Sequence, residues 1–254
     1  MIEPLLQTHG LRKRFGGVIA ADAISLDVPA GEFHAIIGPN GAGKTTLIGL
    51  LAGEIPPDDG TIHLDGSDIT RLAVHRRSAL GLARSFQITS LFPEFTALDN
   101  VALAVQAHAG HSFRFWAKAR TDETLRQPAL AALARVGLDA RRHMRVDRLS
   151  HGEHRQLEIA IALATRPRLL LLDEPMAGLG PEEAAGMVVL LHSLKRELTL
   201  ILVEHDMEAV FALADRITVL VYGRVIASGP PATIRADPTV REAYLGEQQS
   251  AANA

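Results

Sequence analysis

The amino-acid sequence predicts an α/β fold with a mainly parallel sheet, an antiparallel β subdomain near the N-terminus and an α-helical subdomain inserted in the middle of the chain. Apolar stretches of strand length alternate with helical patterns in the last third of the chain, which is the order that parallel sheets require. Helical patterning dominates from about residue 98 to 166. The 254 residues are 47% hydrophobic and 22% charged, which is enough apolar material for one sizeable core.

The first elements are expected to be mainly strands. Residues 5–11 and 23–28 carry apolar side chains in partly alternating order, and the second stretch ends at a Pro-Ala-Gly-Glu turn. Residues 33–37 are apolar at nearly every position, as expected of a strand buried on both faces, and a helix should follow over 44–52. Turn signals flank a short strand at 61–64.

The rest of the chain divides into a helical part and a strand–helix part. We expect helices at 99–108, 122–136 and 150–165, then strands at 169–172, 198–203 and 217–221 that alternate with helices at 181–196 and 206–214. Residues 1–247 are therefore interpreted as a single domain, with a core of 1–90 and 167–247 and a helical subdomain of 91–166. Residues 248–254 are small and polar and are expected to form a flexible tail.

Composition excludes several classes of function. No apolar run approaches the roughly 18 to 20 residues of a membrane-spanning helix, and no secretory signal is visible at Met1, so a cytoplasmic protein is expected. The absence of cysteine excludes disulfides and cysteine-based metal sites. A formal net charge of −3 and only short basic clusters give no electrostatic basis for nucleic-acid binding.

Residues 38–45 match the pattern GxxxxGK[ST] between an expected buried strand and an expected helix. Glycines let backbone N–H groups close around a phosphate, the helix offers its positive end, Lys44 neutralises the β- and γ-phosphates, and Thr45 supplies a hydroxyl to Mg²⁺. A plain turn would need neither the lysine nor the flanking elements. The residues expected to bind the nucleotide here are Gly38, Pro39, Asn40, Gly41, Ala42, Gly43, Lys44, Thr45 and Thr46.

Two further motifs lie at the ends of expected elements. The strand of residues 169–172 delivers Asp173 and Glu174 to the carboxyl edge of the sheet, where Asp173 is expected to hold Mg²⁺ through its water shell and Glu174 to polarise the attacking water. Ser150 and Glu153 form a capping box that begins a helix, and its N-terminus, beside the small Gly152, could receive an anion. By itself this segment is better explained as a capped helix than as an anion site.

With these motifs in this order, the chain resembles the nucleotide-binding subunits of ABC transporters over nearly its full length. The resemblance implies a P-loop NTPase core of the RecA type, ATP and Mg²⁺ as cofactors, and an ATP site completed by a second subunit through the signature that begins at Ser150. It also implies that Gln87 contacts Mg²⁺, that His205 lies near the γ-phosphate, and that Phe15 stacks on adenine. The alternative for Phe15 is packing of its strand against the core.

This chain departs from the family pattern at the signature and at the loop after Glu174. His151 replaces the first glycine of the signature pair and Glu153 replaces its glutamine. The phosphate contact is therefore expected to rest on Ser150 and the backbone of Gly152. Gly180 stands where many members carry aspartate, and either change could make one of two ATP sites less active if the partner is a different chain.

Finer resemblance is to the ATP-binding subunits of bacterial branched-chain amino-acid importers, through segments such as 83–87, 157–160, 204–207 and the ending at 243–247. It implies a second ATPase subunit, identical or different, two integral membrane permeases, a periplasmic binding protein that acts indirectly, and a peripheral position on the inner face of the cell membrane. The lipopolysaccharide-export ATPase is the alternative, and the aromatic insertion at 112–120 favours the importer. A soluble ABC ATPase acting on ribosomes or DNA is disfavoured by the single cassette and the lack of sustained heptads and of a basic surface. A small-molecule kinase would leave the signature, Gln87 and His205 without a role.

Overall fold

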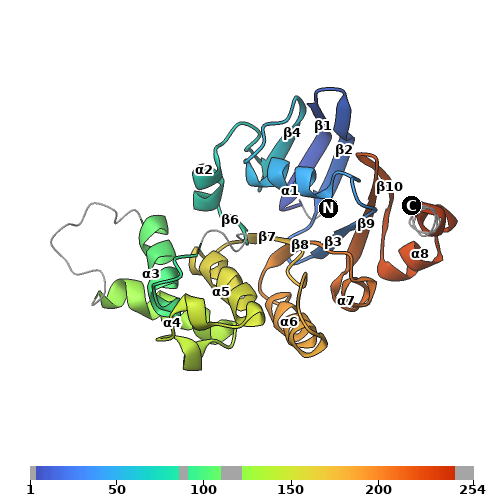
Figure 1. The fold of residues 1–254 in the computed structure, drawn as a ribbon. Helices are drawn as coiled ribbons and strands as arrows, with labels where there is room; N and C mark the ends of the chain where they lie inside the picture. Colours follow the sequence, from blue (N-terminus) through green and yellow to red (C-terminus); the bar gives the residue numbers. More distant parts are fainter. Residues whose placement is uncertain (1–3, 86–90, 110–121, 244–254) are drawn as a thin grey trace.

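The computed structural model describes residues 4–85, 91–109 and 122–243, and Figure 1 shows its arrangement. The strands are β1 (Leu6–Phe15), β2 (Val18–Val28), β3 (Phe33–Ile37), β4 (Asp59–Leu64), β5 (Ser67–Asp68), β6 (Leu82–Arg84), β7 (Leu169–Asp173), β8 (Thr199–Val203), β9 (Arg216–Val221) and β10 (Arg224–Gly229). The α-helices are α1 (Lys44–Ala52), α2 (Val74–Ala79), α3 (Ala97–His108), α4 (Glu123–Arg135), α5 (His151–Ala164), α6 (Pro181–Leu194), α7 (Met207–Leu213) and α8 (Pro231–Ala236).

The strands form two sheets. A four-stranded antiparallel sheet has the order β2-β1-β4-β5, and a six-stranded sheet has the order β10-β9-β3-β8-β7-β6, in which only β10 runs antiparallel to its neighbour. Helices α3, α4 and α5 gather to one side of the sheets, whereas α6 and α7 lie below the six-stranded sheet (Figure 1). The α/β class with a mainly parallel sheet and an antiparallel N-terminal sheet is confirmed.

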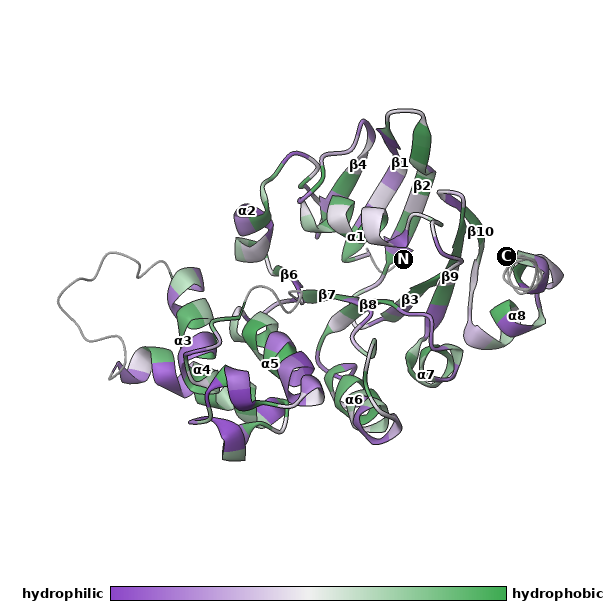
Figure 2. Cartoon of the chain, in the orientation of Figure 1, coloured by the Kyte–Doolittle hydropathy of each residue, from purple (hydrophilic) through white to green (hydrophobic). Residues whose placement is uncertain are grey.

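The central strands β3, β8 and β7 of the six-stranded sheet are buried on both faces, which explains why they are apolar at nearly every position. Successive side chains of a strand point to opposite faces. Accordingly, Ile36 and Leu171 belong to a core shared with α1 and the antiparallel sheet, whereas Ile37 and Leu170 belong to a core shared with the helices on the other face. Figure 2 shows hydrophobic colouring along β3, β7 and β9. Among the helices that the structure describes, none is long and apolar enough to cross a membrane.

The strand register sets the position of the candidate site. Val203, the last residue of β8, pairs with Ile36 on one side and with Asp173 on the other. The carboxyl ends of β3, β8 and β7 are therefore level along one edge of the sheet. Ligands bind at this edge in open parallel sheets, and the chain segments that leave the three strands carry the sequence motifs.

Several short elements were not expected from the sequence, namely β5, α2, β6 and α8, whereas the turn at residues 222–224 predicts a last strand, which is β10. Helix α2 nevertheless has a clear structural role because it carries Arg77, whose side chain is fully buried. Burial lowers the pKa of Arg77 to about 10, so the guanidinium stays charged at neutral pH.

The Arg77 guanidinium donates to four backbone carbonyls. Its Nη1 lies 2.7 Å from the oxygens of both Leu50 and Leu51, in the last turn of α1, and its other nitrogens donate to Leu72 and Thr70 at 2.9 and 3.0 Å. Carbonyls at the end of a helix lack partners within the helix, and the end carries partial negative charge. Arg77 therefore anchors the helix that follows residues 38–43.

Replacement of this anchor should destabilise the fold. We expect Arg77→Met to lower the free energy of unfolding in urea by about 3 kcal/mol, because buried carbonyls lose charged donors. The control is Arg76→Met, which removes an exposed arginine from the same helix and should change stability by less than about 0.5 kcal/mol. Equal effects of the two substitutions would show that Arg77 does not anchor α1.

Candidate active site

The loop of residues 38–43 joins β3 to α1 and depends on two glycines that touch neighbouring backbone. A Cβ atom on Gly38 would lie 2.1 Å from the carbonyl oxygen of Leu220, and one on Gly43 would lie 2.2 Å from that of Ala20. Gly43 also has a φ of +99°, which favours glycine. These contacts hold the loop between β9 and β2, so its compact shape requires glycine at both positions.

The start of α1 and the Lys44 side chain face the inside of this loop. Helix α1 begins after Gly43 with no side-chain cap, so its positive end is directed at the loop. Lys44 is buried, and its Nζ donates to the carbonyls of Gly38 and Pro39 at 2.6 and 2.9 Å. Thr45 is exposed and Thr46 half-buried in the same first turn. The arrangement concentrates positive charge where a phosphate group would lie.

Asp173 and Glu174 end β7 in different environments. Asp173 is nearly buried and its Oδ2 accepts from Nη2 of Arg84 at 2.9 Å, while Arg84 also pairs with Glu54. Burial raises the pKa of Asp173, although the Arg84 charge opposes this shift. Glu174 has a φ of +49° and a side chain that is 43% exposed, and its backbone N–H donates to Val203 at 2.9 Å.

His205 meets Glu174 across the ends of β8 and β7. The Nδ1 atom of His205 lies 4.0 Å from Oε1 of Glu174 and 3.5 Å from Oε2 of Glu204. His205 is 65% exposed, so its ring is accessible to a ligand at the sheet edge. The structure therefore brings the two expected catalytic side chains close together, next to the end of the strand that leads into the phosphate loop.

Glu204 is a site residue that sequence reasoning missed. Its side chain is fully buried, and its carboxylate accepts from the backbone N–H groups of Met176 at 2.9 Å, His205 at 2.9 Å and Asp206 at 3.5 Å. One carboxylate thus ties the loop after β7 to the segment after β8. The only sequence signal was an acidic residue directly after an apolar strand, which is common on surfaces.

Phe15 ends β1 and is half exposed, as are its neighbours Val18 and Ile19 at the start of β2. The Lys13 ammonium lies 5.6 Å from the centre of the Phe15 ring. Ala20 on the same hairpin touches the position of Gly43. The exposure of Phe15 does not fit the alternative of core packing, and it leaves an apolar surface on the hairpin that borders the phosphate loop.

The segment that begins at Ser150 has the expected capping box. Ser150 donates its backbone N–H to Glu153 at 2.8 Å, and its Oγ accepts from the N–H of Glu153 at 3.2 Å. The Nε2 atom of His151 lies 3.3 Å from the carbonyl of Ala177, so this ring packs against the loop after β7. Within the described residues, no side-chain hydrogen bond joins Ser150 to the loop of residues 38–43.

Some expected residues fall outside the described parts of the chain. They include Gln87, the aromatic insertion at 112–120 and the ending from Tyr244 onwards. The backbone N–H of Ser85, just before the first gap, donates to Leu171 of β7 at 2.9 Å. The chain therefore leaves β6 beside the strand that ends at Asp173.

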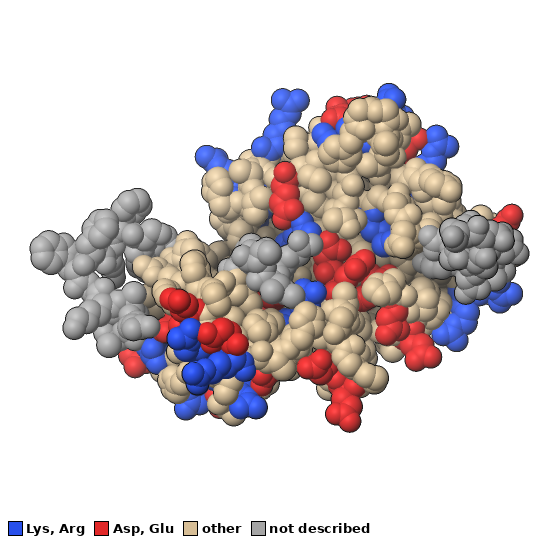
Figure 3. All heavy atoms as spheres, in the orientation of Figure 1, with Lys and Arg blue, Asp and Glu red and all other residues tan. Residues whose placement is uncertain are grey.

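Charge and shape distinguish two surfaces of the molecule. On the face shown in Figure 3, acidic side chains gather near the centre, over the ends of β3 and β8, with basic side chains beside them.

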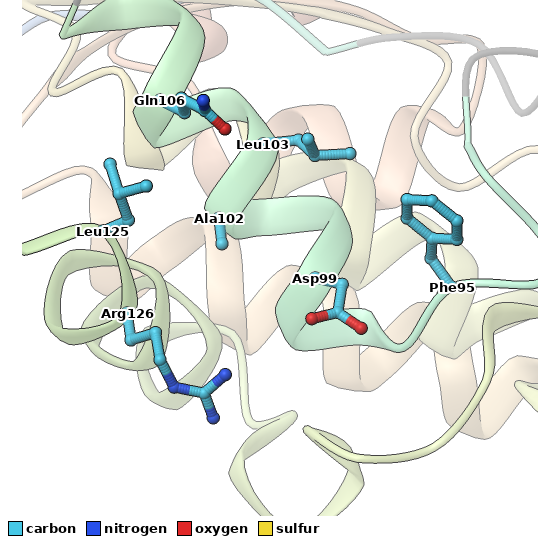
Figure 4. A pocket seen from close by; sticks show the side chains of 7 residues that line it. All are labelled: Phe95, Asp99, Ala102, Leu103, Gln106, Leu125 and Arg126. Atoms are coloured by element: carbon cyan, nitrogen blue, oxygen red, sulfur yellow. The ribbon is translucent and has the colours of Figure 1, made fainter. Parts of the chain in front are cut away.

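A separate pocket of about 200 Å³ lies between α3 and α4, and Figure 4 shows its lining. The residues are Phe95, Asp99, Ala102, Leu103, Gln106, Leu125 and Arg126.

Two protein-family models match the sequence. A model described as ABC transporter matches residues 21–177, more than half of the chain. A model described as branched-chain amino acid ATP-binding cassette transporter matches residues 224–249. Together the matched segments include the phosphate loop, Asp173 and Glu174 at the end of β7, and most of the chain from Arg224 onwards.

Similar proteins and structures give the same result over nearly the whole chain. The high-affinity branched-chain amino acid transport ATP-binding proteins BraF of Pseudomonas aeruginosa and LivG of Escherichia coli K12 are 39% and 38% identical, over 97% of this chain and 100% of each relative. An ATP-binding cassette of an ABC transporter in its ADP conformation superposes with a TM-score of 0.85 at 29% identity, covering 95% of this chain and 98% of that one. A nucleotide-free cassette gives 0.84 at 28%, covering 94% and 98%.

The buried carboxylate of Glu204 should be essential for the shape of the site. In Glu204→Gln, the amide keeps one acceptor oxygen, but its NH₂ group replaces the other oxygen. At least one backbone N–H then faces a donor instead of an acceptor. We therefore expect a loss of about 2 kcal/mol in the free energy of unfolding and faster hydrogen exchange at the Met176 amide. The exposed Glu208→Gln in α7 removes the same charge and serves as control. If both variants behave alike, Glu204 does not join the two loops.

Proposed function

Since this chain belongs to the family of ABC transporter ATP-binding subunits, we propose that it hydrolyses ATP to drive the import of branched-chain amino acids or related small solutes. The family expected from the motifs is thereby confirmed, and the relatives named above are branched-chain amino-acid transport proteins. The observation that carries the proposed activity is the level edge of β3, β8 and β7, where the phosphate loop begins and where Glu174 lies 4.0 Å from His205.

The nucleotide binds with its phosphates in the loop of residues 38–46. Backbone N–H groups at the start of α1 and the Lys44 ammonium neutralise the β- and γ-phosphates. The Lys44 ammonium exchanges its carbonyl partners in the loop for phosphate oxygens. Phe15 stacks on adenine, which its half-exposed ring beside the loop supports.

Hydrolysis uses the two side chains at the ends of β7 and β8. Glu174 accepts a proton from a water molecule as the water oxygen bonds to the γ-phosphorus, and the bond from that phosphorus to the bridging oxygen breaks to release ADP. His205 lies 4.0 Å from Glu174 and orients the γ-phosphate. The exposure of both side chains supports these roles, because each can reach a ligand above the sheet edge.

The donor set fits a Mg²⁺ ion that arrives with the nucleotide. Among the described residues, no three His, Asp or Glu side chains form a group that could bind a metal unaided. Magnesium bound to phosphates needs few protein ligands and keeps several waters. Thr45 would supply a hydroxyl, Asp173 a carboxylate through water, and Gln87 an amide oxygen. The ion would neutralise developing charge on the phosphates.

A second ATP-binding subunit, identical or different, completes the site. Ser150 and Gly152 of one cassette close over the γ-phosphate held by the other, and closure moves two membrane permeases that dock near Gln87. The apolar pocket of α3 and α4, lined partly by Phe95, offers a further surface to a permease loop (Figure 4). The chain then works at the inner face of the membrane. A periplasmic solute-binding protein acts on it only indirectly, through the permeases, and nucleic acid is not a partner.

The alternative within the family is lipopolysaccharide export. The sequence identity of 37–39% to branched-chain amino-acid transport subunits over 97% of the chain favours import. A small-molecule kinase would leave the segment at Ser150 without a role. A soluble ABC ATPase would usually carry two cassettes or a long coiled coil, whereas this sequence shows one cassette and no sustained heptads. Membrane permeases that co-purify with the chain after gentle solubilisation would support the transporter, whereas ribosomal proteins or DNA would contradict it.

Removal of the Lys44 ammonium should weaken nucleotide binding. We expect Lys44→Ala to lower ATP affinity at least about tenfold, because charged hydrogen bonds to the phosphates are lost. Isothermal titration calorimetry measures this directly. The control is Lys195→Ala, which removes an ammonium paired with Asp215 at 2.6 Å. Unchanged affinity of the Lys44 variant would contradict the phosphate-loop assignment.

Glu174→Gln should separate binding from hydrolysis. The amide cannot accept the water proton, so we expect ATP affinity to be retained and hydrolysis to fall about 10² to 10⁴-fold. Uptake of labelled leucine by cells that depend on this chain should fall with it. Glu208→Gln, an exposed change of equal charge, should keep both activities. If Glu174→Gln hydrolyses ATP at the rate of the unsubstituted protein, Glu174 is not the base. If the unsubstituted protein hydrolyses ATP but cells that carry it take up no leucine, leucine is excluded as the transported solute.

A further inference from the structure

The carboxylate of Glu183 lies at the start of two helices at once. Glu183 belongs to the first turn of α6, where its Oε2 accepts from the backbone N–H of Gly180 at 3.3 Å as part of a capping box. Its other oxygen, Oε1, lies 3.2 Å from both Oγ of Ser150 and the backbone N of Gly152. Glu183 therefore contacts the two groups that, under the proposed function, receive the γ-phosphate of a second cassette.

The contact has the chemistry of a bound anion. Three donors point at one carboxylate, and the positive end of α5 favours negative charge at this position. Hydrogen bonds from Gly180, Gly152 and Ser150 lower the pKa of Glu183, so it is ionised at neutral pH. The distances of 3.2–3.3 Å exceed the 2.7–2.9 Å typical of charge-assisted bonds, so the carboxylate can be exchanged for another anion.

The surroundings of Glu183 would oppose a second anion. A hollow of about 300 Å³ opens here, and none of its described lining residues is Lys or Arg. It is lined by Ser150, Gly152, Glu153, Gln156, Glu182, Glu183, Gly186 and Met187. Of its three carboxylates, Glu153 is paired with Arg141 at 2.9 Å. A phosphate that enters the hollow would therefore be repelled unless the Glu183 carboxylate moves away.

We propose that Glu183 is an internal competitor for the γ-phosphate, which occupies Ser150 and Gly152 in the open cassette and must leave before two cassettes close. This inference rests on the proposed function, because it needs a phosphate brought by a second cassette. Glycine at position 152 allows the close approach of the carboxylate, since a Cβ atom there would lie 2.7 Å from Oε1 of Glu183. Because Glu183 must be displaced by a γ-phosphate, two cassettes can close on ATP but not on ADP, which lacks that phosphate.

The test compares two substitutions that remove the same charge from the same turn of α6. Glu183→Gln preserves the capping box, which accepts glutamine, but removes the anion from Ser150. Glu182→Gln is the matched control, because Glu182 is exposed and has no hydrogen bond to Ser150 or Gly152 in the described structure. Hydrolysis by the full-length chain is measured over a range of ATP and protein concentrations, with thermal midpoints as a check on folding.

We expect Glu183→Gln to lower the ATP concentration at half-maximal hydrolysis about two- to fivefold, with little change in the maximal rate. Glu182→Gln removes a charge from the hollow but no hydrogen bond to Ser150 or Gly152, so it should shift this concentration less. A role in folding alone would lower the thermal midpoint without moving the half-maximal concentration. Glu183→Asp, which keeps the charge but shortens the side chain, should give a smaller shift in the same direction.

The possible failures are distinct. If the parent hydrolyses ATP and the Glu183 and Glu182 variants share one half-maximal concentration, the competitor is excluded while the proposed function stands. A higher half-maximal concentration for Glu183→Gln would also exclude it, because the carboxylate would then assist closure. If the parent shows no hydrolysis at any concentration, the proposed function fails and the inference fails with it.

Discussion

The level carboxyl ends of β3, β8 and β7 are the constraint on which the rest of the site depends. Val203 pairs with both Ile36 and Asp173, so the three segments that carry the phosphate loop, Glu174 and His205 leave the sheet at the same level along its edge. A slip of one residue in β8 would turn its side chains to the opposite faces of the sheet. Both faces are packed in hydrophobic cores, so such a slip would place each side chain in a space shaped for a different one, and close packing opposes it.

Close backbone contacts and one buried carboxylate convert this edge into a defined site. Gly38 and Gly43 let the phosphate loop touch β9 and β2, where any side chain would clash with a carbonyl oxygen. Glu204 joins the loop after β7 to the segment after β8. The groups that would meet the nucleotide are thus held by contacts that do not themselves involve a ligand, which is the preorganisation that catalysis requires.

The sequence predicted those features whose causes are local. Apolar runs located β3, β7, β8 and β9, helical periodicity located α3 to α7 within a few residues, and the glycine pattern located the phosphate loop. Short elements such as α2 and β6 were missed because six or three residues hold too little periodicity. Arg77, Glu183 and Glu204 were missed for another reason. Their partners are distant in the chain or are backbone groups, so no spacing reveals them.

The burial of Arg77 has a consequence for how the protein responds to its solvent. Its charge is balanced by carbonyl dipoles of Leu50, Leu51, Leu72 and Thr70, and it forms no ion pair with another described residue. Added salt weakens interactions between exposed charges but reaches buried ones much less. The helix that carries Lys44 is therefore held by an electrostatic contact that ionic strength barely affects, whereas the exposed ion pairs of the helical region, such as Arg145 with Asp147, weaken as salt rises.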